Sequence, residues 1–171
     1  MTATVTVDRP ADPTEQQGAW RPLRVLLAAM DADIARIYAE AQISGLTPSM
    51  VMELLKLHAH GPMTIKELAE SVQRSHSATS QKVAAMRAVG LVRTTTGADA
   101  RTKKVTLTAK ARRIIGKLGA EWRATVAAVS DIESELPYPV GQVVTDIEAA
   151  LARQSFHDRI AEKLASDPDW K

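Results

Sequence analysis

The sequence predicts a mainly α-helical protein that also contains one short two-stranded β-ribbon. Aromatic residues make up only 4% of the 171 residues, whereas 45% are hydrophobic and 25% charged. Ala, Leu, Glu, Lys and Arg are abundant, which favours helix. Apolar residues recur at helical spacing in several segments, and β-branched residues gather between residues 91 and 108. A chain of this length can bury a core, so we expect one globular domain, or one domain with a dimerisation element.

The first part of the chain predicts a tail followed by two helices. Residues 1–18 are rich in Thr, Pro, Asp and Gln and lack apolar periodicity, which is typical of a flexible tail. Apolar residues over 22–43 repeat at helical spacing and predict an amphipathic helix. Thr47 and Pro48 then provide a capping hydroxyl and a first-turn proline for a second helix, which Gly61 and the proline after it should end.

A helix-turn-helix is predicted over residues 64–90. Residues 64–67 have the sequence TIKE, a capping box in which Thr64 accepts from the backbone N–H of Glu67 and the Glu67 carboxylate accepts from the N–H of Thr64. Ser75 is a suitable N-cap for the next helix, which Gly90 should end. Because the join between these two helices is short, they form a helix-turn-helix.

The remaining sequence predicts the β-ribbon and two long helices. LVRTTT (91–96) and VTLT (105–108) are strand-like, and GADARTKK (97–104) between them should form a basic turn. Thr108 should cap a helix that runs to about residue 135, before the LPYP sequence. Apolar positions between Val143 and Leu164 predict a single last helix, and residues 166–171 should be a frayed end.

Charge is distributed unevenly along the chain. Residues 73–117 contain eleven Lys and Arg but one acid, Asp99, so this segment has a net charge of +10. The whole chain has a net charge of +2, which leaves −8 for the rest. A solvated helix face is the alternative explanation, but such a face usually has interspersed acids, which are missing here. The charge pattern therefore favours a polyanionic partner.

Several function classes are disfavoured by what the sequence lacks. It has no cysteine, which excludes disulfides, thiolate nucleophiles and thiol redox sensing. It has no signal-peptide pattern and no long apolar run, so we expect a cytoplasmic protein without a membrane span. Nucleophile-elbow, phosphate-loop, dinucleotide and metalloprotease motifs are also missing, so we expect neither an enzyme nor a cofactor. His58 and His60 are two residues apart on a helix, which points their rings apart, so we expect no metal site.

Three local sequences resemble one family in particular. They are the helix start SHSATSQKV (75–83), the exit Gly90-Leu91-Val92, and a DxR…VxLT pattern at Asp99, Arg101, Val105, Leu107 and Thr108. Together with the order of elements, they resemble the MarR family of winged-helix transcription regulators over about residues 20–165. The sequence departs from the family at Ala111, where glycine is frequent, and at residues 97–98 and 100, where basic residues are frequent. Neither departure removes a charge that DNA binding needs.

The resemblance implies a domain organisation and a function. Residues 47–108 would form the winged helix-turn-helix domain, which binds DNA, and residues 19–46 and 109–165 would form an α-helical dimerisation region. The protein would be a homodimeric repressor that binds a pseudo-palindromic operator, with half-sites about one helical turn apart. The alternatives are an architectural or weakly specific DNA-binding protein and a winged-helix module that binds protein. The operator, the regulated genes and the choice between repression and activation are left open.

Candidate DNA contacts lie in the recognition helix and in the ribbon. The N-terminal half of a recognition helix enters the major groove, so base contacts are expected from Ser77, Ala78 and Gln81, with Arg74 just before the helix. Flanking residues should bind phosphates, although capping is at least as important for the first of them: Ser75, Ser80 and Lys82. The resemblance implies that Arg101 enters the minor groove, oriented by Asp99. Lys103 and Lys104 should contact phosphates.

A ligand-binding site is the last expectation. Many members of the family release DNA when a small aromatic or phenolic ligand enters the cleft between the winged domain and the dimerisation helices. The residues that would line this cleft here are Met30, Tyr38, Met52, His58 and Trp122. Core packing is the alternative explanation for an aromatic or Met side chain at helical spacing, and His58 could instead interact with the helix dipole. The sequence identifies no effector.

Overall fold

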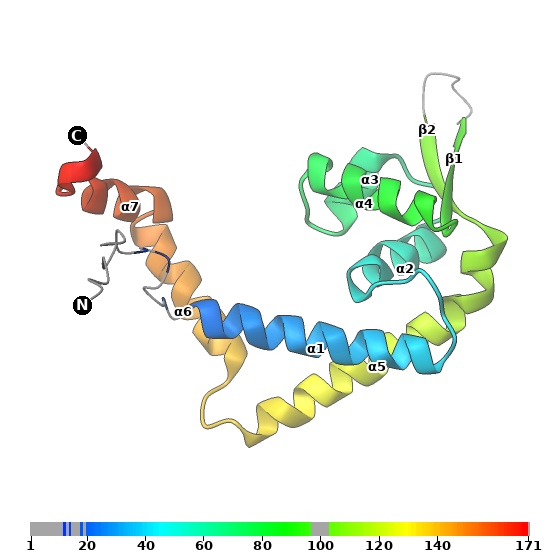
Figure 1. The fold of residues 1–171 in the computed structure, drawn as a ribbon, viewed down its shortest axis with the longest axis horizontal. Helices are drawn as coiled ribbons and strands as arrows, with labels where there is room; N and C mark the ends of the chain where they lie inside the picture. Colours follow the sequence, from blue (N-terminus) through cyan, green and yellow to red (C-terminus); the bar gives the residue numbers. More distant parts are fainter. Residues whose placement is uncertain (1–11, 13, 15–17, 19, 97–102, 171) are drawn as a thin grey trace, which may run out of the picture. The chain divides into compact units, whose positions relative to one another are not determined.

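The computed structural model describes residues 12, 14, 18, 20–96 and 103–170. The chain divides into two compact units, Met1–Leu118 and Gly119–Lys171, and the longest helix, α5 (Ala109–Glu135), crosses the boundary between them. Figure 1 shows the order of the elements along the chain. The predicted fold class is confirmed, since the protein is mainly helical with one β-hairpin.

The first unit begins with helix α1 (Trp20–Glu40) and helix α2 (Val51–His60), which a 3-10 turn, η2 (Pro48–Met50), precedes. Two details differ from the sequence prediction. Helix α1 ends at residue 40, and Gln42 has a φ of 55°, a left-handed conformation that interrupts the helix before residue 43. Thr47 makes no capping hydrogen bond, and its hydroxyl lies 3.0 Å from that of Ser49.

The helix-turn-helix consists of α3 (Ile65–Ser71) and α4 (His76–Ala88) and confirms the local sequence signals. The N–H of Glu67 donates to the Thr64 hydroxyl at 3.1 Å, and the N–H of Thr64 donates to the Glu67 carboxylate at 2.7 Å. The hydroxyl of Ser75 accepts from the N–H of Ala78 at 3.2 Å. Gly90 follows the end of α4 with a φ of 73°, a conformation that glycine adopts without steric cost.

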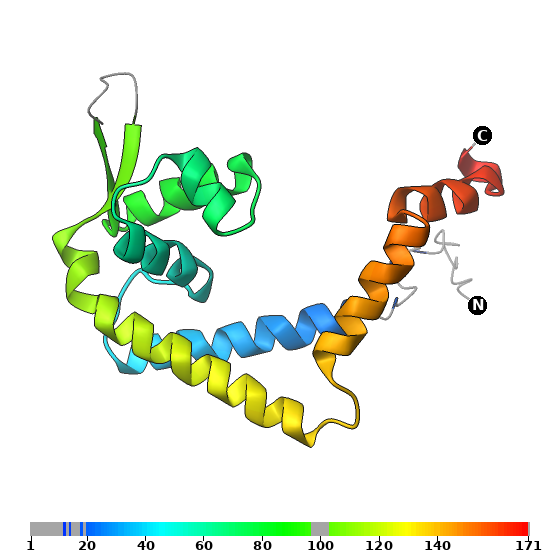
Figure 2. The same cartoon turned by 180° about the vertical axis from the view of Figure 1, so that it is seen from behind.

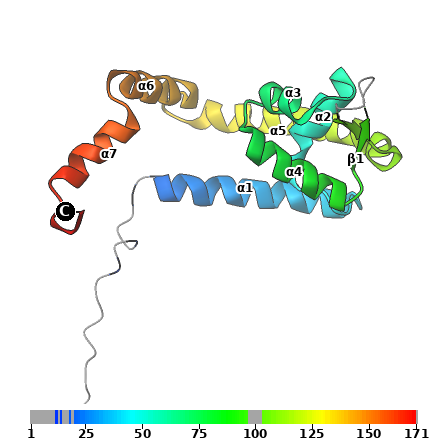
Figure 3. The same cartoon turned by 90° about the horizontal axis from the view of Figure 1, so that it is seen from above.

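The β-hairpin pairs β1 (Val92–Thr96) with β2 (Lys103–Leu107) in antiparallel register, so that Val92 lies opposite Leu107. Strand β2 begins two residues earlier than the sequence indicated, and Lys103 and Lys104 are therefore part of the strand. Met63 and Val105 exchange two backbone hydrogen bonds, of 3.1 and 2.7 Å, which attach the hairpin to the segment before α3. Figures 2 and 3 show the hairpin beside α2, α3 and α4.

The core of the first unit joins all of these elements. Fully buried side chains come from α2, α3, α4, the residue before β1, and α5: Leu54, Leu68, Met86, Leu91 and Leu118. Thr108 connects the hairpin to α5, as predicted. Its hydroxyl donates to the carbonyl of Gly90 at 2.7 Å and accepts from the N–H of Ala111 at 3.3 Å. The Thr108 side chain thus connects the residue after the end of α4 to the first turn of α5.

The second unit contains the distal part of α5, α6 (Val140–Arg153), α7 (Phe156–Ala165) and a 3-10 turn, η3 (Pro168–Trp170). The single last helix predicted from sequence is wrong. Gln154 is extended, with a φ of −151°, and the Ser155 hydroxyl accepts from the N–H of Asp158 at 3.1 Å to start α7. The turn η3 lies where a frayed end was expected. None of the described residues from 119 to 170 is buried.

The described part of the chain contains neither a candidate membrane span nor a group of candidate metal ligands. No described helix has both the length and the apolar character needed to cross a membrane. Likewise, no three His, Asp or Glu side chains among these residues gather closely enough to hold a metal ion. His58 and His60 are both exposed at the end of α2.

Candidate nucleic-acid interface

Helix α4 has a buried side and an exposed side, as its sequence predicted. Thr79, Val83 and Met86 are buried and attach the helix to the core. Ser77, Ala78 and Gln81, the candidates for base contacts, are exposed. The anchoring side is therefore separate from the candidate reading side, which leaves these three side chains free to meet a ligand.

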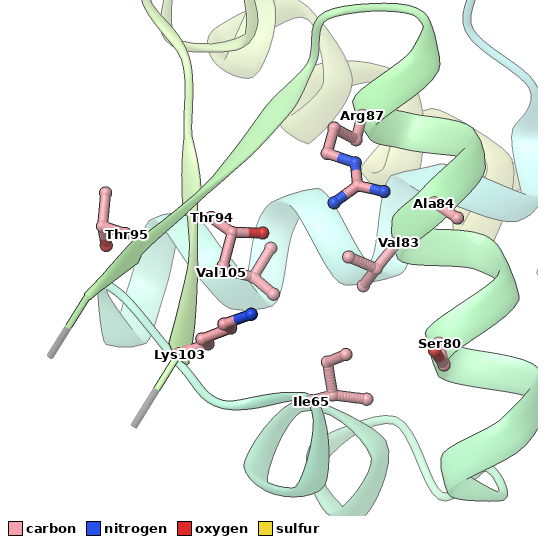
Figure 4. Close-up of a pocket in the computed structure, with 9 residues that line it drawn as sticks. All are labelled: Ile65, Ser80, Val83, Ala84, Arg87, Thr94, Thr95, Lys103 and Val105. Atoms are coloured by element: carbon pink, nitrogen blue, oxygen red, sulfur yellow. The ribbon is translucent and has the colours of Figure 1, made fainter. Parts of the chain in front are cut away.

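A groove of about 380 Å³ lies between α4 and the hairpin. Its wall on the α4 side includes Ser80 and Arg87, and its wall on the hairpin side includes Thr94, Thr95 and Lys103. Figure 4 shows the nitrogen ends of Arg87 and Lys103 in the space between the two elements. The Thr95 hydroxyl is directed to the Lys104 carbonyl, away from this space (Figure 4), so two cations and the hydroxyls of Ser80 and Thr94 line a site suited to an oxyanion.

The remaining predicted residues of the hairpin have different surroundings. Lys104 is half-buried, and its backbone carbonyl accepts a long hydrogen bond of 3.4 Å from the Thr95 hydroxyl. Lys103 is exposed and lines the groove, because adjacent residues of a strand point to opposite faces of the hairpin. Asp99 and Arg101 lie outside the described residues, so their roles stay predictions.

Lys82 is directed into the domain. Its ammonium donates to the backbone carbonyl of Ser49 at 2.6 Å and lies 3.9 Å from the Glu53 carboxylate, and only 14% of its side chain is exposed. Burial lowers the pKa of Lys82, and the charge of Glu53 opposes this shift. The phosphate contact predicted for Lys82 stays a prediction, but it would compete with these internal contacts.

Arg74 is shared between solvent and the same carboxylate. Its side chain is 41% exposed, and its Nε lies 3.9 Å from Glu53 Oε1. Ser75, the next residue, uses its hydroxyl oxygen to cap α4. The alternative of a capping role for Ser75 is therefore correct, and a phosphate contact by the same hydroxyl stays a prediction.

Sequence reasoning missed Arg87 and Glu53. Arg87 is seven residues after Ser80, so both lie on one row along α4. Ser80 was already a candidate phosphate contact, so the spacing of seven residues could have identified Arg87 beside it. Glu53 is three residues after Met50 and four before Leu57, both of which are buried, and this spacing places Glu53 on the core side of α2.

The residues predicted to line a ligand pocket do not share one environment. Tyr38 is 3% exposed and belongs to the core of the first unit, and Met52 packs against that core. Met30 is half-buried on α1, and His58 is exposed on α2. Trp122 lies in the second unit and is 37% exposed. Core packing accounts for Tyr38, and the pocket itself stays a prediction.

Comparisons with known proteins agree with this architecture. A protein-family model described as HVO_A0114 matches residues 46–114, and no curated protein matches the chain. The transcriptional regulator MosR of M. tuberculosis, solved in complex with DNA, is 27% identical, with a TM-score of 0.57 over 81% of this chain and 99% of that one. MepR of S. aureus, also solved with DNA, is 16% identical, with a TM-score of 0.58 over 81% and 98% of the two chains.

A third solved structure is a MarR protein from Peptoclostridium difficile. It is 16% identical, with a TM-score of 0.54 over 86% of this chain and 93% of that one. At such identities the last two matches establish the fold. The resemblance seen in the sequence is thereby confirmed: the chain has a MarR-like winged helix-turn-helix fold with flanking helices, and its structural neighbours are MarR-family transcriptional regulators matched over about 80% of its length.

Proposed function

We propose that this protein is a sequence-specific DNA-binding transcriptional regulator that acts as a homodimeric repressor. The observation that supports this most directly is the juxtaposition of the exposed reading side of α4 with the cationic groove beside the hairpin. Both lie in the segment whose net charge is +10. That MosR and MepR were solved with DNA supports DNA as the polyanion. A catalytic role is not part of the proposal.

Base readout and phosphate binding are assigned to different residues. Gln81 is suited to a paired hydrogen bond with adenine, and Ala78 to contact with a thymine methyl group. Ser77 completes this exposed surface. The groove would hold a backbone phosphate between Arg87 and Lys103, with the Ser80 hydroxyl as a further donor.

The tip of the hairpin would contact the adjacent minor groove. This part of the proposal rests on the sequence prediction. Arg101 would enter the minor groove, Asp99 would orient the Arg101 side chain, and the charge of Lys104 would support binding. Substitution of Arg101 by Ala should weaken DNA binding and reduce the salt slope by about one phosphate equivalent. Gel-shift titrations at several salt concentrations measure both quantities, and an unchanged affinity and slope would remove Arg101 from the interface.

Dimerisation is supported by apolar side chains that each unit leaves exposed. On α1, the exposed fractions of Val25 and Leu26 are 62% and 55%. In the second unit, Val126 and Val144 are 57% and 49% exposed. A second copy of the chain would cover these surfaces around a two-fold axis, and the half-sites would then be about 10 bp apart.

A competition gel shift at fixed salt tests the proposal. The labelled probe is the DNA upstream of the protein's own gene, and the competitors are the same DNA and random DNA of equal length. A sequence-specific regulator should be displaced by the cognate competitor at a concentration about 1000-fold lower than by random DNA. Equal displacement would indicate an architectural protein, and no shift at low salt would favour a module that binds protein.

We also propose that a small ligand releases the protein from DNA. A ligand in the family's cleft would approach Met30, Met52, His58 and Trp122, since Tyr38 is already part of the core. Thermal unfolding with and without aromatic carboxylates and phenols tests this directly, because a ligand that binds only the native state raises the unfolding temperature. No shift with any compound at millimolar concentration would argue against an effector of this class.

A further inference from the structure

A buried carboxylate lies directly behind the recognition helix. Glu53, on α2, is 0% exposed, and neither of its carboxylate oxygens has a hydrogen-bond partner. Its neighbour Leu54 is also fully buried. A carboxylate removed from water without hydrogen bonds is costly, so its charge must be compensated by nearby cations.

Two cations provide this compensation, and both come from the DNA-binding element. The Nε of Arg74, in the turn before α4, and the Nζ of Lys82, on α4, each lie 3.9 Å from Glu53 Oε1. At this distance they form ion pairs and not hydrogen bonds. Both side chains are among the candidate DNA contacts that the sequence predicts.

We propose that Glu53 is a positioning residue that competes with DNA phosphates for Arg74 and Lys82. Together with the Ser49 carbonyl, Glu53 holds Lys82 against α2, and it attracts the more exposed Arg74, so less positive charge is available to the duplex and sequence-independent affinity stays low. Specific binding then depends more strongly on the base contacts of Ser77 and Gln81. This inference rests on the proposed function, because it concerns how the same DNA-binding surface is restrained.

The balance of energies makes this role separable from stability. Removing one partner of a buried ion pair destabilises a protein when the other charge stays buried, but Arg74 and Lys82 are 41% and 14% exposed and their long side chains can turn toward solvent. Phosphate contacts, in contrast, each add about 0.9 to the salt slope, which corresponds to roughly tenfold in affinity at 0.1 M salt. Loss of Glu53 should therefore increase binding to random DNA, whereas loss of a merely structural residue should decrease it.

The test uses the full chain and a random-sequence duplex of 30 bp, titrated by fluorescence anisotropy at three salt concentrations. Glu53→Gln and Glu53→Met are compared with Glu70→Gln, which removes an exposed acid from α3. We expect the two Glu53 variants to bind about tenfold more tightly, with a salt slope steeper by one to two. Glu70→Gln should change the affinity less and leave the slope unchanged.

The outcomes separate this inference from the proposed function. A folded Glu53 variant that binds the duplex equally or more weakly would overturn the inference, as would an equal gain in Glu70→Gln. If the wild-type protein does not bind DNA at low salt, the proposed function itself fails.

A second pair of variants tests the inference if both Glu53 variants unfold. Lys82→Gln and Arg87→Gln, each made in the wild-type protein, show whether Lys82 contributes to phosphate binding as Arg87 does. We expect Lys82→Gln to leave the slope nearly unchanged and Arg87→Gln to reduce it by about one; equal losses would contradict the inference.

Discussion

The two units of the chain differ in how completely they bury their apolar residues. The first unit encloses a core in which Leu54, Leu68 and Met86 are fully buried. In the second unit, no described residue between 119 and 170 is buried, although α6 and α7 are rich in apolar side chains. A helix with an uncovered apolar face gains little stability from tertiary packing. The first unit thus has a core of its own, although α1 leaves Val25 and Leu26 exposed, whereas no residue is buried among the described residues of the second unit.

The two units also differ in charge. Residues 1–118 have a net charge of +7, whereas residues 119–171 have a net charge of −5. An acidic unit is repelled by DNA and a basic unit is attracted to it. Both differences are consistent with the proposal that the first unit contacts DNA and that the second contributes to the pairing of chains.

Substitution of Val126 by Glu should have the largest effect. Val126 is 57% exposed on α5, and in a dimer the new charge would be buried at the interface without a partner. We expect a monomer in sedimentation velocity and a loss of specific DNA affinity of about two orders of magnitude. Ala124→Glu, at an exposed position on the opposite side of the same helix, is the matched control and should stay dimeric. A dimeric Val126→Glu protein would show that the apolar residues of the second unit do not pair chains.

Substitution of Gln81 by Ala should have the next largest effect, and only on specificity. Gln81 is exposed on α4 and is the best candidate for base readout. Loss of a paired base contact should reduce discrimination by about 1–3 kcal/mol. Competition binding with cognate and random DNA measures this ratio, and affinity for random DNA should not change. A parallel loss on both DNAs would instead identify Gln81 as a phosphate contact.

Substitution of Arg87 by Gln should weaken binding to all sequences. Arg87 lines the groove between α4 and the hairpin, where a phosphate contact is sequence-independent. We expect the salt slope to fall by about one and affinity at 0.1 M salt to fall by roughly tenfold. Arg112→Gln, at an exposed position of α5, serves as control for the loss of a positive charge. An equal effect in both variants would mean that the groove holds no phosphate.

Substitution of Ser75 by Ala should have the smallest effect on binding and a measurable effect on stability. The Ser75 hydroxyl caps α4 through the N–H of Ala78. Loss of such a cap costs about 1 kcal/mol of the free energy of unfolding. Chemical denaturation measures the change, and Ser75→Asp, which retains a capping oxygen, should restore stability. If Ser75→Ala is as stable as wild type but binds DNA weakly, the hydroxyl acts on DNA instead.

The features that could be predicted from sequence are those formed by residues close together in the chain. The capping box of Thr64 and Glu67 and the cap at Ser75 involve partners three residues apart, so their spacing identifies them. The division between α6 and α7 was missed because apolar spacing continues past Gln154, although Ser155 with Asp158 is itself a capping pattern. Helical periodicity alone does not detect a break that preserves the apolar face.

The internal ion pairs could not be predicted in the same way. Lys82 bonds to the carbonyl of Ser49, 33 residues earlier, and local sequence contains no information about that contact. For the same reason, Lys82 was expected to face the DNA. Glu53 was not singled out from the sequence, although its register with Met50 and Leu57 places it on the buried face of α2. Candidate DNA contacts that share one face of a helix could thus be predicted from the sequence. Ion pairs between elements that are distant in the sequence could not.

The stoichiometry of the protein on DNA tests the central comparison most directly. Sedimentation velocity with a fluorescently labelled duplex from upstream of the gene counts the chains in each specific complex. If the first unit reads DNA and the second pairs two chains, the complex contains two protomers per duplex, and Val126→Glu does not form it at the same concentration. A specific complex with one protomer per duplex, at wild-type affinity, would contradict the account.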